Sequence, residues 1–309
     1  SGIGGLWTSN LLGSYDPFVA FAPVAHATDR IRMGPIAINP FDIHPTRIAA
    51  ALLTLNEISH GRAQIVVGGG GEALEALNLK PERRVTAVRE CVALIRQAAT
   101  GVKGDFDGQV FQAKGFGCEW ASQPPPPIWI GANGPQMIAM AAKVADGIMM
   151  SDLPQPELGK AILAAKAVRA EAGNAAPVSF SNFVAWHVYD DIEKARAEAR
   201  RWLAWRGLNR RWICTHFISD AEFDLIEANM PALYQMAFGG PRPDAVPRSL
   251  MDTLADKLTL TGQIDALEPV IAHLEELRDA GLTHVAIRLY QDIEQSIALI
   301  GKHIVPHFH

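Results

Sequence analysis

The feature best suited to chemistry is a run of four glycines followed by a carboxylate. Gly68–Gly71 follow the apolar stretch Ile65–Val67, and Glu72 comes next. Glycine permits positive φ and lets a flat or phosphorylated ligand approach the backbone closely. A carboxylate in a partly dry pocket has a raised pKa and can act as a general acid. We therefore expect this loop to face a ligand. The alternative is a flexible turn, with Glu72 favoured only by the dipole of the helix that follows.

A second glycine-rich turn has the properties of a phosphate cradle. Gly131-Ala132-Asn133-Gly134-Pro135 follows the apolar stretch Ile128–Ile130 and leads into a helix that begins at Pro135. Such a helix start leaves free N–H groups and a positive dipole end near the strand ends. The segment is neither a Walker A motif nor a GxGxxG motif. The alternative is an ordinary tight turn between a strand and a helix.

Two weaker signals accompany these turns. The apolar segment Gly34–Ile38 ends in Asn39-Pro40, and because Pro cannot donate to a sheet ladder the strand must stop or bulge there. The basic pair Arg83-Arg84 opens a helix, which is the unfavourable end for cations, and an anionic partner nearby would explain it.

Histidine and cysteine patterns argue against a metal site or a catalytic triad. Cys91, Cys118 and Cys214 are far apart and form no CxxC or Cys/His spacing, so we expect no disulfide framework, no metal and a reducing compartment. The histidines form no HExxH motif, and only His187 lies at the end of a predicted strand. The tryptophans Trp202, Trp205 and Trp212 are more typical of packing than of a cofactor site.

Charge and hydropathy restrict the partners. The net charge of -5 and the pI near 6.1 give no basic surplus for nucleic acid or an anionic membrane. No apolar stretch is long enough to span a bilayer, and no signal peptide is recognisable. We expect a soluble, cytoplasmic protein that acts on a small molecule.

The elements that must position these residues alternate between strands and helices. Short β-branched runs alternate with segments of helical period, which predicts a parallel sheet and an α/β fold of the (β/α)8 TIM-barrel type. In such barrels the loops after the strands hold the active site. The predicted strands lie near 5–9, 31–38, 63–68, 127–132, 147–151, 178–187 and 283–289. Since a closed barrel needs eight, we expect one strand upstream of Ser1.

Two excursions interrupt this alternation. Residues 100–126 predict a hairpin around Asp107-Gly108 followed by a proline run, and residues 207–260 predict an insertion with a helix near 220–237. The length and the 49% hydrophobic composition allow one domain over residues 1–309.

Together these segments resemble the luciferase-like, flavin-dependent oxidoreductase superfamily, and most of all its deazaflavin branch around methylene-tetrahydromethanopterin reductase. The similar segments cover nearly the whole chain except 207–257. They include LWTSN at 6–10, the stretch 30–72, DFDGQVF at 105–111, PPPPIWIGANGPQMIAMAAKVADGIMMS at 124–151 and AGLTHVAIRL at 280–289.

The resemblance implies a place for each part of the cofactor. It implies a cis peptide bond at Ile36–Ala37 that supports the ring, a wrapping loop at Gly70-Gly71-Glu72-Ala73-Leu74, and a phosphate site at Gly131–Pro135. Trp7, Ser9 and Asn39 are implied as further cofactor-binding residues, and Glu72 matches a proton-donating carboxylate in related sugar-phosphate dehydrogenases.

One position departs from the family pattern. Relatives often carry Asp-His after the Trp-containing strand, where this chain has Asn10-Leu11. The role of that His cannot be transferred, and Asn10 stays a candidate catalytic residue by position. The basic residues that grip a sugar phosphate in relatives are also not recognisable.

The function that follows from the resemblance is hydride transfer between coenzyme F420 and a small organic substrate, with Glu72 as proton donor. One alternative is an FMN-dependent monooxygenase of the same fold. Another is a non-catalytic homologue that only binds F420 or a flavin. A homodimer is expected from the family.

Overall fold

The computed structural model describes residues 2–308, apart from the side chains of Glu72 and Ala73. These residues form two compact units. We call Ile3–Met149 with Ala164–Ser179 the N-terminal unit, and Met150–Leu163 with Phe180 onward the C-terminal unit. All residues predicted to form the site lie in the N-terminal unit.

Parallel strands form the centre of the N-terminal unit. β1 pairs with β2, β3 pairs with β6, and β6 pairs with β7, all in parallel. Bridges from Met33 to Ala63 and from Ile38 to Val67 connect β2 to β3. Spatial order therefore follows chain order, as in successive strands of a barrel. The strands are β1 (Gly5–Ser9), β2 (Arg32–Ile36), β3 (Ile65–Val67), β6 (Ile128–Gly131) and β7 (Gly147–Ser151).

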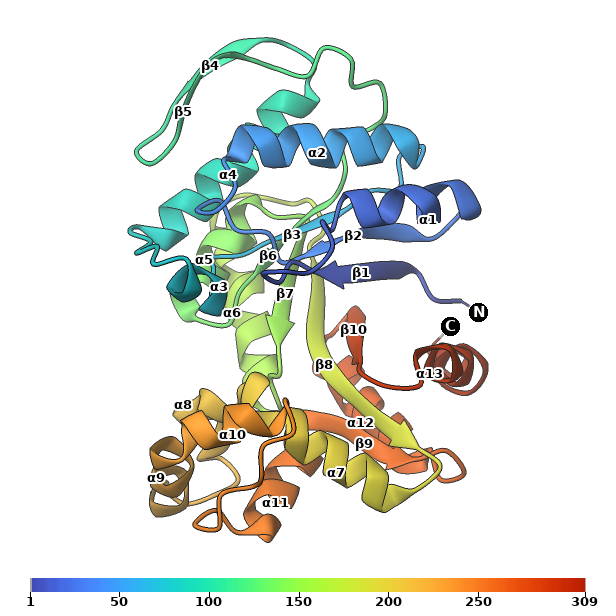
Figure 1. Cartoon of the computed structure of the whole chain (residues 1–309). Helices are drawn as coiled ribbons and strands as arrows, with labels where there is room; N and C mark the ends of the chain where they lie inside the picture. Colours follow the sequence, from blue (N-terminus) through green and yellow to red (C-terminus); the bar gives the residue numbers. More distant parts are fainter. Residues whose placement is uncertain (1, 309) are drawn as a thin grey trace. The chain divides into compact units, whose positions relative to one another are not determined.

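Helices connect these strands, and their inner faces are apolar. Ile48 and Leu52 on α2 and Leu94 on α4 are fully buried, and α2 packs on α4 (Figure 1). α5 begins at Pro135, where the missing N–H costs no hydrogen bond. The helices are α1 (Ala22–Ala27), α2 (Pro45–Ile58), α3 (Glu72–Ala76), α4 (Arg84–Ala99) and α5 (Pro135–Val144), and α6 (Glu157–Glu171) follows β7 with its first residues, up to Leu163, in the C-terminal unit.

The predicted hairpin is present as β4 (Gly104–Asp107) and β5 (Gln112–Phe116), which pair antiparallel. A buried carboxylate attaches it to α4, because Glu90 accepts hydrogen bonds from the backbone N–H groups of Gln109, Val110 and Phe111. Burial alone would raise the pKa of Glu90, but these three donors lower it. The prediction for residues 104–116 is confirmed.

The C-terminal unit is organised around β8 (Ser179–Tyr189). β10 (His284–Leu289) and β9 (Thr259–Gln263) both pair with it in parallel. The segment 207–258 is mostly helical, and Figure 1 shows α8–α11 gathered there. The helices are α7 (Ile192–Trp202), α8 (Arg211–Cys214), α9 (Asp220–Ala228), α10 (Met230–Met236), α11 (Arg248–Leu258), α12 (Glu268–Asp279) and α13 (Ile293–Leu299).

β9 corrects the predicted strand count. The count of seven parallel strands is wrong, because Thr259–Gln263 adds an eighth within the described residues. The expectation of a strand upstream of Ser1 depends on the count of seven, and it loses that support. The single domain over 1–309 stays a prediction.

None of the described helices combines the length and hydropathy needed to cross a bilayer.

Candidate functional site

The loops after β2 and β3 continue to pair beyond the ends of their strands. Ile38 N–H donates to the Val66 carbonyl at 2.9 Å, and Gly68 N–H donates to the Ile38 carbonyl at 2.8 Å. The Ile36–Ala37 peptide bond is cis, as the resemblance implies. Ala37 is exposed between two buried isoleucines. One small side chain is thus presented at the strand ends.

Glycine allows the second loop to approach the first closely. A Cβ on Gly68 would lie 3.1 Å from the Cβ of Ala37, and a Cβ on Gly131 would lie 3.8 Å from the Cα of Gly68. Gly68 therefore lies close to both Ala37 and Gly131, and the nearest side-chain atoms are Ala37 Cβ and, at 3.6 Å from an added Cβ on Gly131, Val66 Cγ1. This explains why a ligand-facing surface here carries glycine.

Gly70 turns the loop back over its own helix. Its φ is +79°, and a Cβ there would lie 2.1 Å from Leu74 Cδ1. Leu74 is buried, and the buried Asn39 lies beside Gly70 while its Oδ1 accepts from Phe41 N–H. The structure thus brings together Asn39, Gly70 and Leu74. Glu72 and Ala73 lie on α3, but their side chains are outside the described part of the structure.

The start of α5 is open. Gly134 is its N-cap, no side chain caps it, and a Cβ on Gly134 would meet nothing within 4 Å. Ile138 N–H already donates to the Gly134 carbonyl at 3.0 Å, so the amides of Gln136 and Met137 form the exposed end of the helix. An anion at this point would be stabilised by these N–H groups and by the helix dipole.

Arg84 is a site residue that motif reasoning only partly identified. A Cβ on Gly69 would lie 3.4 Å from Met137 Cε and 3.8 Å from Arg84 Cδ. The first turn of α4 therefore lies against the glycine loop and the first turn of α5. Arg84 is exposed, and no ion pair to it is found among the described residues. Arg83, by contrast, donates to Gln109 of the hairpin at 3.4 Å.

The β1 residues are less closely connected. Trp7 is half-buried and packs edge-to-face on Trp129 of β6, with ring centroids 6.4 Å apart. Ser9 and Asn10 are half-buried at the end of β1. Within the described residues no hydrogen bond joins Asn10 to the glycine loops. Its catalytic role stays a prediction.

The C-terminal unit holds a buried polar group that sequence reasoning missed. Arg206 donates to Asp152 at 2.8 Å and to the Phe183 carbonyl at 2.8 Å. Tyr290 stacks between Trp202 and His187, with centroid distances of 4.6 and 5.2 Å. These residues come from distant segments, and only the position of His187 at a strand end signalled them.

The described residues form no candidate metal site, and none of their cysteines is exposed. No group of three His, Cys, Asp or Glu side chains is arranged to hold a metal ion there. All three cysteines are free and buried, and burial raises the pKa of each thiol.

Comparison with known proteins agrees with this geometry. The family described as luciferase-like monooxygenase matches residues 1–284. The chain belongs to this family of oxidoreductases. A 5,10-methylenetetrahydromethanopterin reductase of Archaeoglobus fulgidus is 30% identical over 99% of this chain and 92% of that protein.

Two solved structures share the fold. The coenzyme F420 dependent tetrahydromethanopterin reductase of Methanopyrus kandleri has a TM-score of 0.81 and 22% identity, covering 99% of this chain and 91% of that one. The oxygenating constituent of 3,6-diketocamphane monooxygenase of Pseudomonas putida, in complex with FMN, has a TM-score of 0.67 and 18% identity, covering 98% and 88%. The predicted α/β fold of the luciferase-like barrel type is confirmed.

Proposed function

We propose that this chain transfers a hydride between coenzyme F420 and a small organic substrate. The observation that carries the proposal is the surface of nearly bare backbone where Ala37, Gly68 and Gly131 meet. It lies beside the uncapped start of α5 and the cation of Arg84. A flat ring with an anionic tail needs this combination of close backbone approach and positive potential.

The residues present fit such a group. At Gly71 and at Gly134 an added Cβ would meet no atom within 4 Å, so both positions face open space. Ala37, which lies against Gly68, offers only a methyl group. We infer that the ring rests on Ala37 and the Gly70–Leu74 loop, and that Gly131–Pro135 holds the phosphate.

F420 is preferred over FMN for reasons of charge and similarity. F420 carries carboxylates beyond its phosphate, and FMN does not. Arg84, which lies beside Gly69 together with Met137 of α5, offers positive charge near the proposed phosphate site. The Archaeoglobus and Methanopyrus relatives are both reductases of the same pterin, and the second is described as F420-dependent.

The chain's own residues would orient the cofactor and the substrate and would protonate the substrate, while the bound deazaflavin supplies the hydride. Backbone N–H groups of Gln136 and Met137 anchor the anionic end, and Trp7 closes the β1 side against Trp129. Glu72, at the start of α3, is the proposed proton donor. Asn10 can orient a substrate carbonyl or imine through its amide, but it cannot act as the base that an Asp-His pair provides.

Cofactor binding by the full chain is the direct test. We expect F420 to bind and FMN to bind at least about tenfold more weakly, a difference of roughly 1.4 kcal/mol. Arg84→Gln should weaken F420 binding, whereas Arg89→Gln, an exposed arginine on the same helix, should not. Fluorescence titration with each cofactor measures both effects.

Two results would overturn the proposal. Binding of FMN but not of F420 would favour the oxygen-activating alternative, which the FMN complex of similar fold represents. Tight F420 binding with no turnover of imines, enones or ketones would favour the non-catalytic homologue. The homodimer and the cytoplasmic location stay predictions.

A further inference from the structure

A pocket separate from the proposed cofactor site lies entirely within the C-terminal unit, beside β9. Its volume is about 410 Å³, within the range that holds a small-molecule ligand. It is lined by α7, the end of α11, β9 and the start of α12. The lining residues that matter below are Ile192, Arg196, Asp256, Thr261, Val270 and His273.

The edge of β9 supplies peptide groups to this pocket. Ile264 N–H donates to the Tyr189 carbonyl of β8 at 2.9 Å. In a parallel ladder, alternate residues of one strand face the same neighbour, so Gly262 and Ile264 face β8. Thr261 and Gln263 then direct their peptide groups toward the opposite edge, and both line the pocket. No residue of β8 lines it, which agrees with this orientation.

Charged groups in the pocket are not matched to one another. The Nε atom of Arg196 is buried and has no hydrogen-bond partner among the described residues. Its Nη1 lies 3.7 Å from Glu193, a weak contact on the same helix. Asp256 has neither a hydrogen bond nor an ion pair within the described residues, and it makes no direct ion pair with Arg196. Burial raises the pKa of Asp256, and the charge of Arg196 opposes this.

Arg196, whose side chain is 42% exposed, and the exposed Asp256 are both open to solvent, so each charge can pair with a ligand that enters the pocket. Burial also lowers the pKa of His273, which favours a neutral imidazole there. The remaining wall is apolar and includes Ile192, Leu260 and Val270. The pocket thus offers a cation, an anion and an apolar wall within one ligand-sized volume.

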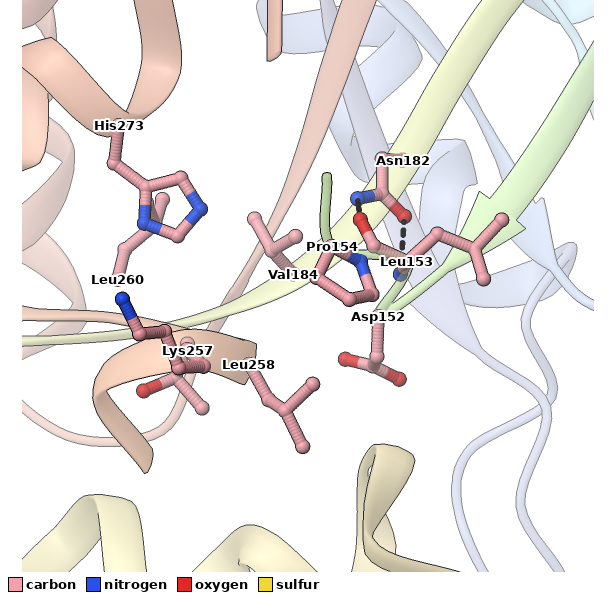
Figure 2. A pocket seen from close by; sticks show the side chains of 10 residues that line it. Asp152, Leu153, Pro154, Asn182, Val184, Lys257, Leu258, Leu260 and His273 are labelled. Carbon is pink, nitrogen blue, oxygen red and sulfur yellow. Dashed lines mark hydrogen bonds between the residues drawn. The ribbon is translucent and has the colours of Figure 1, made fainter. Parts of the chain in front are cut away.

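The inner side of this region is closed. His273, Thr259 and Leu260 also line a neighbouring cavity of about 10 Å³, room for about one water molecule. Figure 2 shows His273 and Lys257 on one side of this cavity and Asp152 on the other. Asn182 seals it by two hydrogen bonds with the backbone of Leu153, at 3.2 and 2.9 Å. A ligand larger than water is therefore confined to the outer pocket.

We propose that the pocket between α7, β9 and α12 binds a small amphoteric molecule of the apolar α-amino acid class. Its carboxylate pairs with Arg196, its ammonium group with Asp256, and its side chain packs on Ile192 and Val270. The Thr261 peptide group adds a hydrogen bond. This site uses none of the residues assigned to the cofactor.

The test is calorimetric titration of the full chain with L-leucine, L-isoleucine, L-valine and L-phenylalanine as probes. At least one probe should bind, and Arg196→Gln and Asp256→Asn should each weaken it tenfold or more. Arg89→Gln, on α4, serves as the charge-matched control and should leave binding unchanged. Circular dichroism and the unfolding midpoint of each variant establish that it is folded.

The proposal is overturned if none of the four probes at 10 mM gives a heat of binding or a shift in Tm. This concentration is high enough to detect binding even with a Kd of about 1 mM. Equal binding by the folded variants and the wild type would overturn it as well. If either variant fails to fold, n-pentylamine and pentanoate, each lacking one charge, replace it. Both should bind at least tenfold more weakly than the best amino acid, and equal binding would contradict the assignment. The result of the amino-acid titration does not change what is expected of the F420 titration. Failure of one proposal is therefore distinguishable from failure of the other.

Discussion

The guanidinium of Arg206 lies 2.7 Å from a carboxylate oxygen of Asp152, and both side chains are almost fully buried. Removing one partner leaves an uncompensated buried charge, which costs about 3–5 kcal/mol in other proteins. We predict a loss of this size in the unfolding free energy of Arg206→Gln, measured by urea titration. Lys103→Gln breaks the exposed pair with Glu119 and should cost less than about 1 kcal/mol. Equal losses in the two variants would contradict the prediction.

His187 should make the protein less stable as pH falls. Burial lowers its pKa to about 3, and neither ring nitrogen has a hydrogen-bond partner among the described residues. Below about pH 6.5 the unfolded chain binds a proton that the folded chain does not, so stability falls by about 1.4 kcal/mol per pH unit toward pH 3. In His187→Phe this component should vanish, giving a shallower decline between pH 6.5 and 5. If the unfolding free energy of His187→Phe falls with pH as steeply as that of the wild type, the prediction is wrong.

Glu90 should hold the hairpin to α4 only while its carboxyl is ionised. Its folded pKa is lowered, so its contribution is present above the unfolded pKa of about 4.3 and is lost as pH falls through the folded pKa. We predict that Glu90→Gln costs about 1.5–3 kcal/mol at pH 7 and that this cost shrinks as pH falls from about 4.3 through the folded pKa. Hydrogen exchange at Gln109, Val110 and Phe111 should accelerate in the variant. Glu119→Gln, at an exposed pair, is the control.

Two neighbouring glycines should respond differently to alanine. Gly70→Ala combines a φ of +79° with a clash against Leu74, so we expect a lower Tm and weaker F420 binding. Gly71→Ala adds a methyl group in open space, where the ring is proposed to lie. It should weaken F420 binding without changing Tm. Gly4→Ala, also open, should change neither. If Gly71→Ala binds F420 normally, the ring does not lie against this loop.

Much of the N-terminal unit is predictable from sequence because its signals are local. The runs before Gly68 and Gly131 are β-branched and apolar, and glycine or proline follows each, so strand and turn can be read together. Their convergence follows from the rule that parallel strands end at one edge. The cis peptide bond at Ile36–Ala37 was expected only from the family resemblance, because no local sequence pattern requires it.

In the C-terminal unit the predicted strands near 178–187 and 283–289 are present as β8 and β10, whereas β9 and the Arg206–Asp152 pair were missed for physical reasons. β9 is the short sequence Thr-Leu-Thr-Gly-Gln, which has neither strict alternation nor an apolar run. It is a strand because β8 offers an unpaired edge. Arg206 and Asp152 are separated by 54 positions, and their pairing depends on tertiary packing alone. Non-local pairs of this kind leave no trace in spacing.

The pairing of β8 with β10 also bears on synthesis at the ribosome. Phe180 and Thr283 are hydrogen-bonded across 103 positions of sequence. A growing chain therefore carries β8 without this neighbour while the intervening helices emerge. During that interval an apolar strand edge is accessible to chaperones and to other nascent chains. Yield at high expression should depend on how fast the residues after Leu258 are made.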